Sequence, residues 1–325
     1  MMKRTITTAA FLLMTTLGGL VAGAQPATPA RDAKMKVIFD TDIGDDIDDV
    51  FALALLVTQP NVELLGVTTA WGDTALRARL TSRFLAAIGR TDVPVYAGPQ
   101  TTEHTVFTQA TYAMAFPEKQ WPDATTFTLD AIQRNPGEIT LIAVAPFSNV
   151  GALIDKDPAT FRKLKRVVLM GGSIKRSYGD LGYSANPSPS AEYNIYSDIP
   201  SSQKLFASGV PISVMPLDST QLKLDEVKRD LLFSHGSAMT DQLTLLYYQW
   251  SASTGSPTPT LFDVMAVAAA VNPGLCPTTP MRIRVDDKGF TRPEEGTPNA
   301  DACLQSDPEQ FFRFYLTAVL RYSAK

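Results

Sequence analysis

Residues 36–49 read Lys-Val-Ile-Phe-Asp-Thr-Asp-Ile-Gly-Asp-Asp-Ile-Asp-Asp, so six aspartates follow a short apolar run. An apolar run that ends at a glycine turn is typical of a buried strand, and residues 50–59 continue as a helix. Six carboxylates this close together cannot all be ionised in a partly buried place without a positive counter-charge. Oxygen ligands at such density suit a hard divalent cation, calcium before magnesium, so the stretch predicts a metal site. Helix capping is the alternative explanation for one or two of these residues, Asp45 and Asp46.

Strand-like and helix-like segments alternate along the chain almost without interruption. The strand-like segments are 37–40, 63–69, 93–97, 139–144, 166–170 and 211–215, and the helix-like segments are 48–58, 74–88, 128–134, 148–154 and 199–207. This alternation predicts an α/β fold with a mostly parallel, Rossmann-like central sheet flanked by helices. The chain is mainly helical from 222 to 271, with strand-like residues at 281–285. We therefore expect a smaller helical subdomain over the sheet edge, near the active site.

Polar residues gather where the predicted strands end. In folds of this kind ligands bind beyond the carboxyl ends of the strands. Those ends hold Asp40 and Asp42, Thr68 and Thr69, residues 144–149, residues 171–172 and Asp218. Residues 175–190 are rich in Gly, Ser, Pro, Asn and Tyr, which predicts a long loop that covers or lines the site.

The first 24 residues have the pattern of a secretory signal peptide. Lys3 and Arg4 form a charged start, residues 9–21 are mostly apolar, and Ala22-Gly23-Ala24 is a small-residue cleavage site. The apolar part is too short for a comfortable membrane span, so we expect no membrane partner. The sequence thus predicts cleavage before Gln25, a flexible lead over residues 25–34 and a single domain over residues 35–325. The protein is expected to be exported, either to a periplasm or into the medium.

Composition excludes some classes of partner. The net charge is −4 and 45% of the residues are hydrophobic, which suits one large core. No basic patch is present, so a nucleic acid polymer is not an expected partner. Cys276 and Cys303 are expected to form a disulfide in an oxidising compartment, with two buried free thiols as the alternative.

Five later segments join the aspartate-rich stretch in a resemblance to a known family. They are Val-Thr-Thr-Ala-Trp-Gly-Asp at 67–73, Ala-Pro-Phe-Ser-Asn at 145–149, Val-Leu-Met-Gly-Gly at 168–172, Ala-Glu-Tyr-Asn at 191–194 and Leu-Phe-Asp at 261–263. Together and in this order they resemble the calcium-dependent nucleoside hydrolases of the inosine–uridine-preferring group. The resemblance implies an exported nucleoside N-ribohydrolase. Such an enzyme cleaves the N-glycosidic bond of purine or pyrimidine ribonucleosides with an activated water, giving free base and ribose.

The resemblance also implies roles for individual residues. Asp42 would bind Ca²⁺ and take a proton from the attacking water, as the general base. The other calcium ligands would be Asp49, the main-chain carbonyl of Val144, and Asp263. The implied substrate-binding residues are Asp48, Asp73, Asn186, Glu192 and Asn194. A turn residue is the alternative for Asn186, and a helix cap is the alternative for Glu192 and Asn194.

The chain departs from the family pattern in three places. Its first motif is two residues longer than the common form, so Asp46 is an alternative ligand. Asp73 stands where an Asn often follows the glycine. Phe262 precedes Asp263 where many members carry a histidine that protonates the leaving base. Possible substitutes for this acid are Tyr193, Tyr247, Tyr248 and His235, or the base would stack on Trp71 or Trp250. A solvated surface position is the alternative for His235.

Two other functions fit parts of the sequence. With Phe262 in the acid position, the protein could be a catalytically weak, Ca²⁺-dependent nucleoside- or ribose-binding protein. Asp40 and Asp42 after a strand also fit a haloacid-dehalogenase-type phosphatase, although Gly44 stands where that motif needs Thr or Val. Base preference is open at this point. The resemblance makes a homodimer or homotetramer an expected assembly.

Overall fold

A computed structural model describes residues 34–103 and 106–323. Residues 34–325 form one compact unit. The predicted signal peptide and residues 25–33 of the predicted lead lie outside the described residues. No helix in the described part of the chain combines the length and the apolar run that a membrane crossing needs.

Nine strands form one sheet in the order β3-β2-β1-β4-β5-β6-β9-β7-β8. The strands from β3 to β9 in this order are paired in parallel, and β7 pairs antiparallel with both β9 and β8. The strand bounds are β1 (Met35–Thr41), β2 (Val62–Thr69), β3 (Val95–Ala97), β4 (Ile139–Ala143), β5 (Arg166–Met170), β6 (Ile212–Met215), β7 (Thr279–Val285), β8 (Thr291–Glu294) and β9 (Ala300–Ala302). The predicted α/β fold with a mostly parallel sheet is confirmed.

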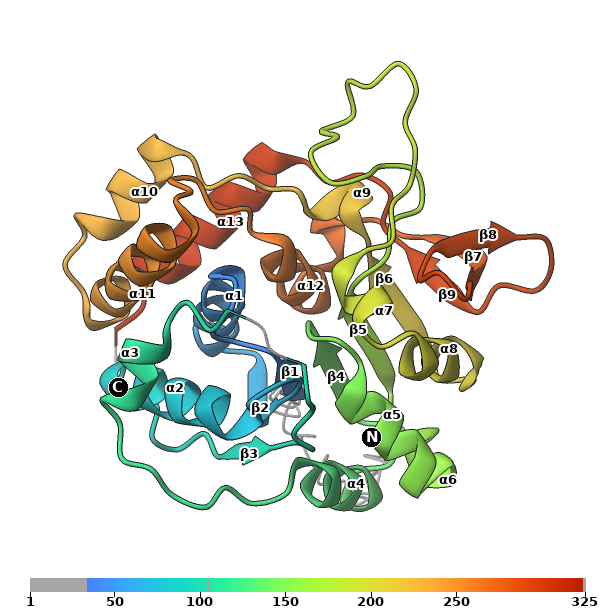
Figure 1. Cartoon of the computed structure of the whole chain (residues 1–325), viewed down its shortest axis with the longest axis horizontal. Helices are drawn as coiled ribbons and strands as arrows, with labels where there is room; N and C mark the ends of the chain where they lie inside the picture. The colour runs from blue at the N-terminus through green and yellow to red at the C-terminus, as the bar shows by residue number, and fades with distance from the viewer. Residues whose placement is uncertain (1–33, 104–105, 324–325) are drawn as a thin grey trace, which may run out of the picture. The chain divides into compact units, whose positions relative to one another are not determined.

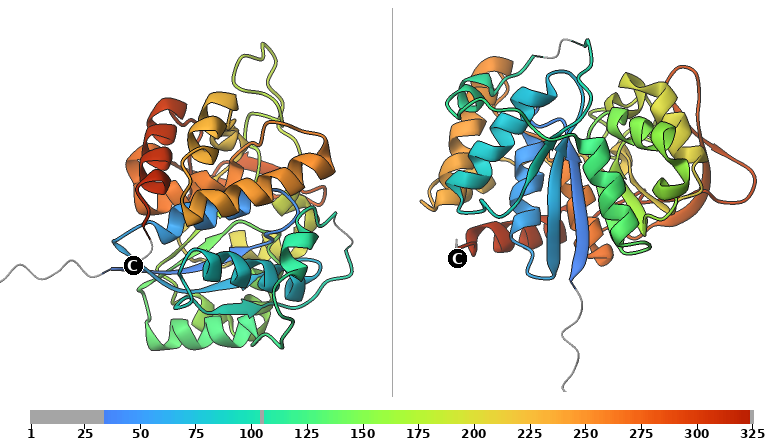
Figure 2. Two further views of the ribbon diagram at one scale, coloured as in Figure 1. Left: turned by 90° about the vertical axis from the view of Figure 1, so that its left-hand side faces the viewer. Right: turned by 90° about the horizontal axis from the view of Figure 1, so that it is seen from below.

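Helices cover both faces of this sheet (Figure 1, and Figure 2, right). The helix bounds are α1 (Asp48–Val57), α2 (Thr74–Ala87), α3 (Ala110–Met114), α4 (Ala124–Arg134), α5 (Ser148–Lys156), α6 (Pro158–Phe161), α7 (Tyr193–Ser197), α8 (Ile199–Ala207), α9 (Leu217–Thr220), α10 (Glu226–Phe233), α11 (Ala238–Thr254), α12 (Phe262–Val271), the 3₁₀ helix η1 (Pro273–Leu275) and α13 (Pro308–Leu320).

Strand side chains alternate between two apolar cores, one on each face. Val37 and Phe39 of β1 join the core shared with α1, α2, α11, α12 and α13, whereas Ile38 joins the core shared with α4, α5 and α8. Val168 and Leu169 of β5 divide in the same way. Because central parallel strands are buried on both sides, they read in the sequence as continuous apolar runs.

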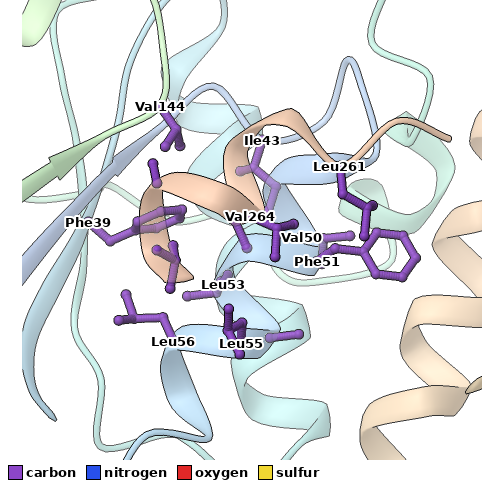
Figure 3. Packing of buried hydrophobic residues seen from close by; sticks show 14 of the residues in the cluster. Phe39, Ile43, Val50, Phe51, Leu53, Leu55, Leu56, Val144, Leu261 and Val264 are labelled. Atoms are coloured by element: carbon purple, nitrogen blue, oxygen red, sulfur yellow. The ribbon is translucent and has the colours of Figure 1, made fainter. Parts of the chain in front are cut away.

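Two wholly apolar helix faces meet at the centre of the first core. All ten residues of α1 are buried, and so are eight residues of α12. The two helices pack against each other and α12 packs on β5. Figure 3 shows Phe39, Val50, Leu53 and Val264 gathered where β1, α1 and α12 meet. Both helices begin with acidic residues in the first turn, so this packing brings those acids together.

The helical subdomain lies near the predicted active site, as expected, but it packs on other helices instead of over the sheet edge. Helix α11 contacts α1, α2, α10 and α13, so α10 and α11 rest on helices of one face of the sheet and not on an edge strand. The reason is the apolar side of α11, whose Leu243, Leu246 and Trp250 join the first core. The end of α11 still reaches the cavity described below, near the predicted active site.

Several elements were absent from the sequence prediction. These include α3, β8, β9 and the C-terminal helix α13. The two cysteines, Cys276 after η1 and Cys303 after β9, form a disulfide, with their Cα atoms 5.6 Å apart. This bond ties the segment after α12 to the antiparallel part of the sheet.

Candidate active site

A cavity of about 530 Å³ opens at the carboxyl ends of β1, β4 and β5. It collects residues from the loop after β1, from the first turns of α1, α7 and α12, from the end of α11 and from two loops. Its lining residues are Asp42, Asp45, Asp46, Asp48, Asp49, Val106, Thr108, Val144, Met170, Tyr178, Glu192, Tyr193, Asn194, Trp250, Thr254, Phe262 and Asp263. Most of the sequence-predicted site residues are therefore brought to one place.

Three buried carboxylates form the centre of the cavity floor. Asp48 and Asp49 lie in the first turn of α1, and Asp263 lies in the first turn of α12. One carboxylate oxygen from each falls within 4.8 Å of the others. The main-chain N–H of Asp263 donates to Oδ2 of Asp48 at 3.1 Å, which ties the two helix starts together. Both helix N-termini direct partial positive charge at the cluster, which stabilises negative charge there.

The end of β1 adds Asp42 and orients Asp49. Thr41 Oγ1 donates to Oδ1 of Asp49 at 2.5 Å and accepts from the main-chain N–H of Ile43 at 3.1 Å. Asp42 is buried and lines the cavity beside these groups. Val144 follows β4, and its N–H donates to the carbonyl of Asp40 at 2.9 Å. The ladder between β1 and β4 thus sets the position of the Val144 carbonyl relative to the aspartates.

Burial dominates the electrostatics of the cluster. Loss of solvation raises the pKa of Asp48, Asp49 and Asp263 well above the ordinary value, and repulsion among the neighbouring carboxylates raises each pKa further. Burial likewise raises the pKa of Asp42, while the guanidinium of Arg77 acts in the opposite direction. Without an added positive charge, these groups would have to hold protons to remain buried.

These residues fit a hard divalent cation. The donors are carboxylate oxygens and one main-chain carbonyl, all from buried residues, which is the ligand type that calcium takes. A cation would offset the burial and the repulsion that raise the pKa of these four carboxylates, so the donor set and its charge point to the same kind of ligand. Asp48, Asp49 and Asp263 each place an oxygen within 4.8 Å of the others, and Asp42 and Val144 line the same cavity.

A second hydrogen-bond network surrounds Asp40 near the end of β1. Oδ1 of the buried Asp40 accepts from Thr68 Oγ1 and from Asn149 Nδ2, both at 2.6 Å. These partners come from β2 and α5, so the network joins the ends of three neighbouring elements. Burial raises the pKa of Asp40 to about 6, although both hydrogen bonds act to lower it.

Glu192 and Asn194 add polar groups to the cavity lining from the start of α7. Glu192 caps α7, with its carboxylate accepting from the N–H groups of Gly172 at 2.9 Å, Asn194 at 3.0 Å and Ile195 at 3.2 Å. Asn194 Nδ2 donates to the carbonyls of Val144 at 3.3 Å and Met170 at 3.1 Å. Glu192 therefore both caps α7 and lines the cavity, whereas Asn194 lines the cavity without capping the helix.

Several sequence-predicted residues are not brought to the cavity. Asn186 is exposed on the long loop between β5 and α7, which extends away from the helices in Figure 1. Asp73 is exposed and caps α2, where its Oδ1 accepts from the N–H of Leu76 at 2.9 Å. His235 is exposed in the turn between α10 and α11, and Trp71 is buried outside the lining. The remaining two of the additional candidates, Asp46 and Trp250, both line the cavity.

The residues considered as substitutes for a leaving-group acid do not all lie in the cavity. Tyr193 lines the cavity, whereas Tyr247 donates its hydroxyl to the carbonyl of Pro257 at 2.7 Å and Tyr248 is exposed. Phe262 lies on the cavity wall with its ring 6.0 Å from that of Tyr178, edge to face. Tyr178 was missed because a tyrosine in an irregular loop carries no periodic signal.

Arg77 was also missed in the prediction from the sequence. Its side chain has no exposed surface, and it pairs with Asp45 at 2.8 Å. A signal existed in the sequence, because Arg77 falls on the same face of α2 as the buried Ala78, Thr81, Phe84 and Leu85. A charged residue on an apolar helix face needs a buried partner of opposite charge, and the six aspartates need a positive counter-charge. The two features of the sequence therefore fit each other.

Comparisons with known proteins agree with one another. The family model for inosine-uridine preferring nucleoside hydrolase matches residues 37–313. Uridine nucleosidase 1 of Arabidopsis thaliana is 29% identical over 278 residues, covering 78% of this chain and 79% of that protein. An uncharacterized protein of Schizosaccharomyces pombe is 33% identical over 210 residues, covering 60% of this chain and 65% of that protein. The solved plant nucleoside hydrolase PpNRh1 has the same fold, with a TM-score of 0.77 at 22% identity over 89% of this chain and 99% of that chain.

A divalent cation is expected to raise the melting temperature of the chain. A ligand that binds only the folded state, at 100 times its Kd, adds about 2.7 kcal/mol, which corresponds to roughly 5 °C for a chain of this size. Differential scanning fluorimetry with calcium, with magnesium and with a chelator measures the shift. Asp263→Asn removes one ligand and should abolish most of it, and an equal shift in this variant and the wild type would contradict the assignment.

Proposed function

Because the chain belongs to the inosine-uridine preferring nucleoside hydrolase family, a family of metal-dependent hydrolases that act on N-glycosidic bonds, we propose that it hydrolyses ribonucleosides to free base and ribose with Ca²⁺. We further propose that it acts outside the cytoplasm, in a periplasm or in the medium. The observation that carries the proposal is one cavity lined by two kinds of polar group. One is the set of carboxylates of α1, α12 and the end of β1, and the other is Glu192 and Asn194 at the start of α7.

The carboxylate wall suits activation of water. Bound calcium would orient the 2′,3′-diol of the ribose and lower the pKa of a water molecule. Asp42 lines the same cavity and accepts the proton of the attacking water. The buried carboxylates around it also favour the positive charge that develops on the sugar as the glycosidic bond breaks.

Glu192 and Asn194 suit the sugar. Ribose hydroxyls can donate hydrogen bonds, and the carboxylate of Glu192 and the amide oxygen of Asn194 can accept them. Glu192 is held by three main-chain N–H groups and Asn194 by two carbonyls, so neither side chain needs to reorganise when the ribose enters. Asp48, at the start of α1, lines the same cavity and would meet a hydroxyl beside the metal.

The leaving base meets an aromatic wall. Phe262, Tyr178, Tyr193 and Trp250 all line the cavity. Phenylalanine cannot donate a proton, so departure of the base relies on stacking and on the other polar groups of the wall. Tyr193 is the one substitute acid from the sequence that lies in the cavity and carries an ionisable hydroxyl.

Base release from a panel of purine and pyrimidine nucleosides tests the proposal directly. Release that stops when a chelator is added is the expected result, and the panel ranks the substrates. Asp42→Asn should lower kcat by about 10²–10⁴-fold, the range for a general base, with a much smaller change in KM.

Two other results would redirect the proposal. If the chain binds nucleoside with calcium but releases no base, it is a binding protein. Phe262 in place of an acid would then explain why it does not hydrolyse the nucleoside. If neither base release nor nucleoside binding is detected, the chain remains a member of the family but the proposed activity is overturned.

Export is supported by two independent features. Residues 1–24 have a signal-peptide pattern, and Cys276 and Cys303 form a disulfide, a bond that is rare in the cytosol. Mass spectrometry of the protein recovered outside the cytoplasm should find Gln25 as its first residue. Full-length protein confined to the cytoplasm would contradict export without touching the catalytic proposal.

The charge of the cavity predicts selection against nucleotides. Its lining includes seven carboxylates and, among the residues that the structure describes, no lysine, arginine or histidine. A 5′-monophosphate brings about two negative charges, and like charges in close contact cost several kcal/mol. We expect kcat/KM for a 5′-monophosphate to be at least about 10³-fold below that for its nucleoside. A 5′-O-methyl nucleoside adds bulk without charge and should be a far better substrate, whereas equal rejection of both would show that size alone decides.

A further inference from the structure

Arg77 connects α2 to the two irregular segments that follow β1 and β2. Its Nε donates to the carbonyl of Trp71 at 2.7 Å, and its Nη1 donates to the carbonyls of Asp42 and, at 3.3 Å, Ile43. Nη1 and Nη2 also reach the two oxygens of Asp45 at 3.1 Å and 2.8 Å. A guanidinium presents its donors in a rigid planar fork, so one side chain fixes several acceptors relative to one another.

The segment that Arg77 holds has no regular structure of its own. It runs from Asp42 to Ile47, between the end of β1 and the start of α1, and it contains the two residues by which this motif exceeds the common form. Gly44 adopts a φ of 127°, and a side chain there would collide with the ring of Phe107 at 2.2 Å. A long turn of this kind keeps one conformation only where its surroundings impose it.

A second segment holds the same turn from the opposite side. Thr108 Oγ1 donates to the carbonyl of Asp45 at 2.7 Å, and Gln109 Nε2 donates to the carbonyl of Asp46 at 2.8 Å. Neither of these contacts reaches Asp42. Arg77 is thus the side chain that couples the general base to the extended turn.

Trp71 shows the same need for support. It has a φ of 66°, a left-handed conformation that costs a bulky residue of order 1–3 kcal/mol. The Arg77 Nε donates to the carbonyl of this residue. One guanidinium therefore stabilises both of the irregular segments that follow β1 and β2.

We propose that Arg77 is a positioning residue, which sets Asp42 for attack by fixing its main-chain carbonyl and the neighbouring Asp45. This role rests on the hydrolase activity proposed above. A displacement of about 1 Å at a reacting group can cost about 10²-fold in rate. Loss of Arg77 therefore lowers kcat, while KM is largely set by Glu192, Asn194 and Asp48.

The test compares Arg77→Met, Arg77→Lys and Asp45→Asn in the full chain, with steady-state kinetics and calorimetric titration with Ca²⁺. Arg77→Met should lower kcat about 10²-fold or more with KM within about threefold. Arg77→Lys keeps the charge without the fork and should recover only part of the rate. Asp45→Asn keeps one acceptor and should lose less than Arg77→Met.

Calcium affinity distinguishes a lost positive charge from a lost positioning contact, because the two change the affinity in opposite directions. Removing a nearby positive charge would by itself tighten binding of a cation, whereas a released turn should weaken it, and we expect about tenfold weaker binding. Arg166→Met is the matched control, because Arg166 is a partly buried arginine that donates to the carbonyl of Ala270 at 2.9 Å, at the start of β5 and away from the cavity. It should leave kcat and calcium affinity unchanged.

Separate results would overturn this role and the proposed function. An active wild type whose Arg77→Met variant is folded, keeps kcat within about twofold, or binds calcium more tightly, overturns the positioning role. An equal loss of kcat in Arg166→Met would overturn it as well, by tracing the loss to general destabilisation. If the wild type has no turnover, the hydrolase proposal fails, and the positioning role is judged on calcium affinity alone. A wild type that neither turns over nor binds calcium overturns both.

Discussion

The candidate site depends on burying negative charge at the starts of two apolar helices. Helix α1 has no exposed residue, and α12 packs against it and on β5. Their first turns carry Asp48, Asp49 and Asp263, so packing of the core and assembly of the acidic cluster are the same event. The two helix N-termini and Arg77 offset part of the charge, and a proton or a cation must offset the rest.

The sequence was sufficient for the elements that build this core. Residues 166–170 and 199–207 were predicted at their observed bounds, because an apolar run and a well-capped amphipathic helix are local signals. The aspartates of α1 and Asp263 could be assigned to one site, because carboxyl ends of parallel strands share an edge of the sheet. Strands β8 and β9 were missed, since both are short and carry little local pattern, and β9 also pairs with the distant strand β6. The helix α13 was missed for a different reason, since Phe311, Phe312 and Tyr315 on its buried side were not considered together.

The cavity walls were harder to predict than its floor. Asn186 was expected beside Glu192, but it lies on a loop whose path is not encoded by any periodicity. Tyr178 reaches the cavity from the same loop, and its hydroxyl accepts from the N–H of Tyr193 at 2.9 Å. Arg77 was overlooked because a helix with three arginines reads as solvated, although one of the three falls on the buried side. Spatial neighbours of an irregular loop are the information that a single sequence lacks.

The complete burial of α1 has a consequence for how this protein can diversify. Every position on that helix touches the core, so a substitution there alters packing and the acidic cluster together, at a cost of about 2–5 kcal/mol for a large apolar residue cut to alanine. Part of the cavity lining is built differently, because Tyr178, Tyr193 and Val106 are exposed. Changes at such positions are usually within about 0.5 kcal/mol of neutral. The exposed part of the lining can therefore vary at little cost in stability, whereas α1 and the acidic cluster cannot.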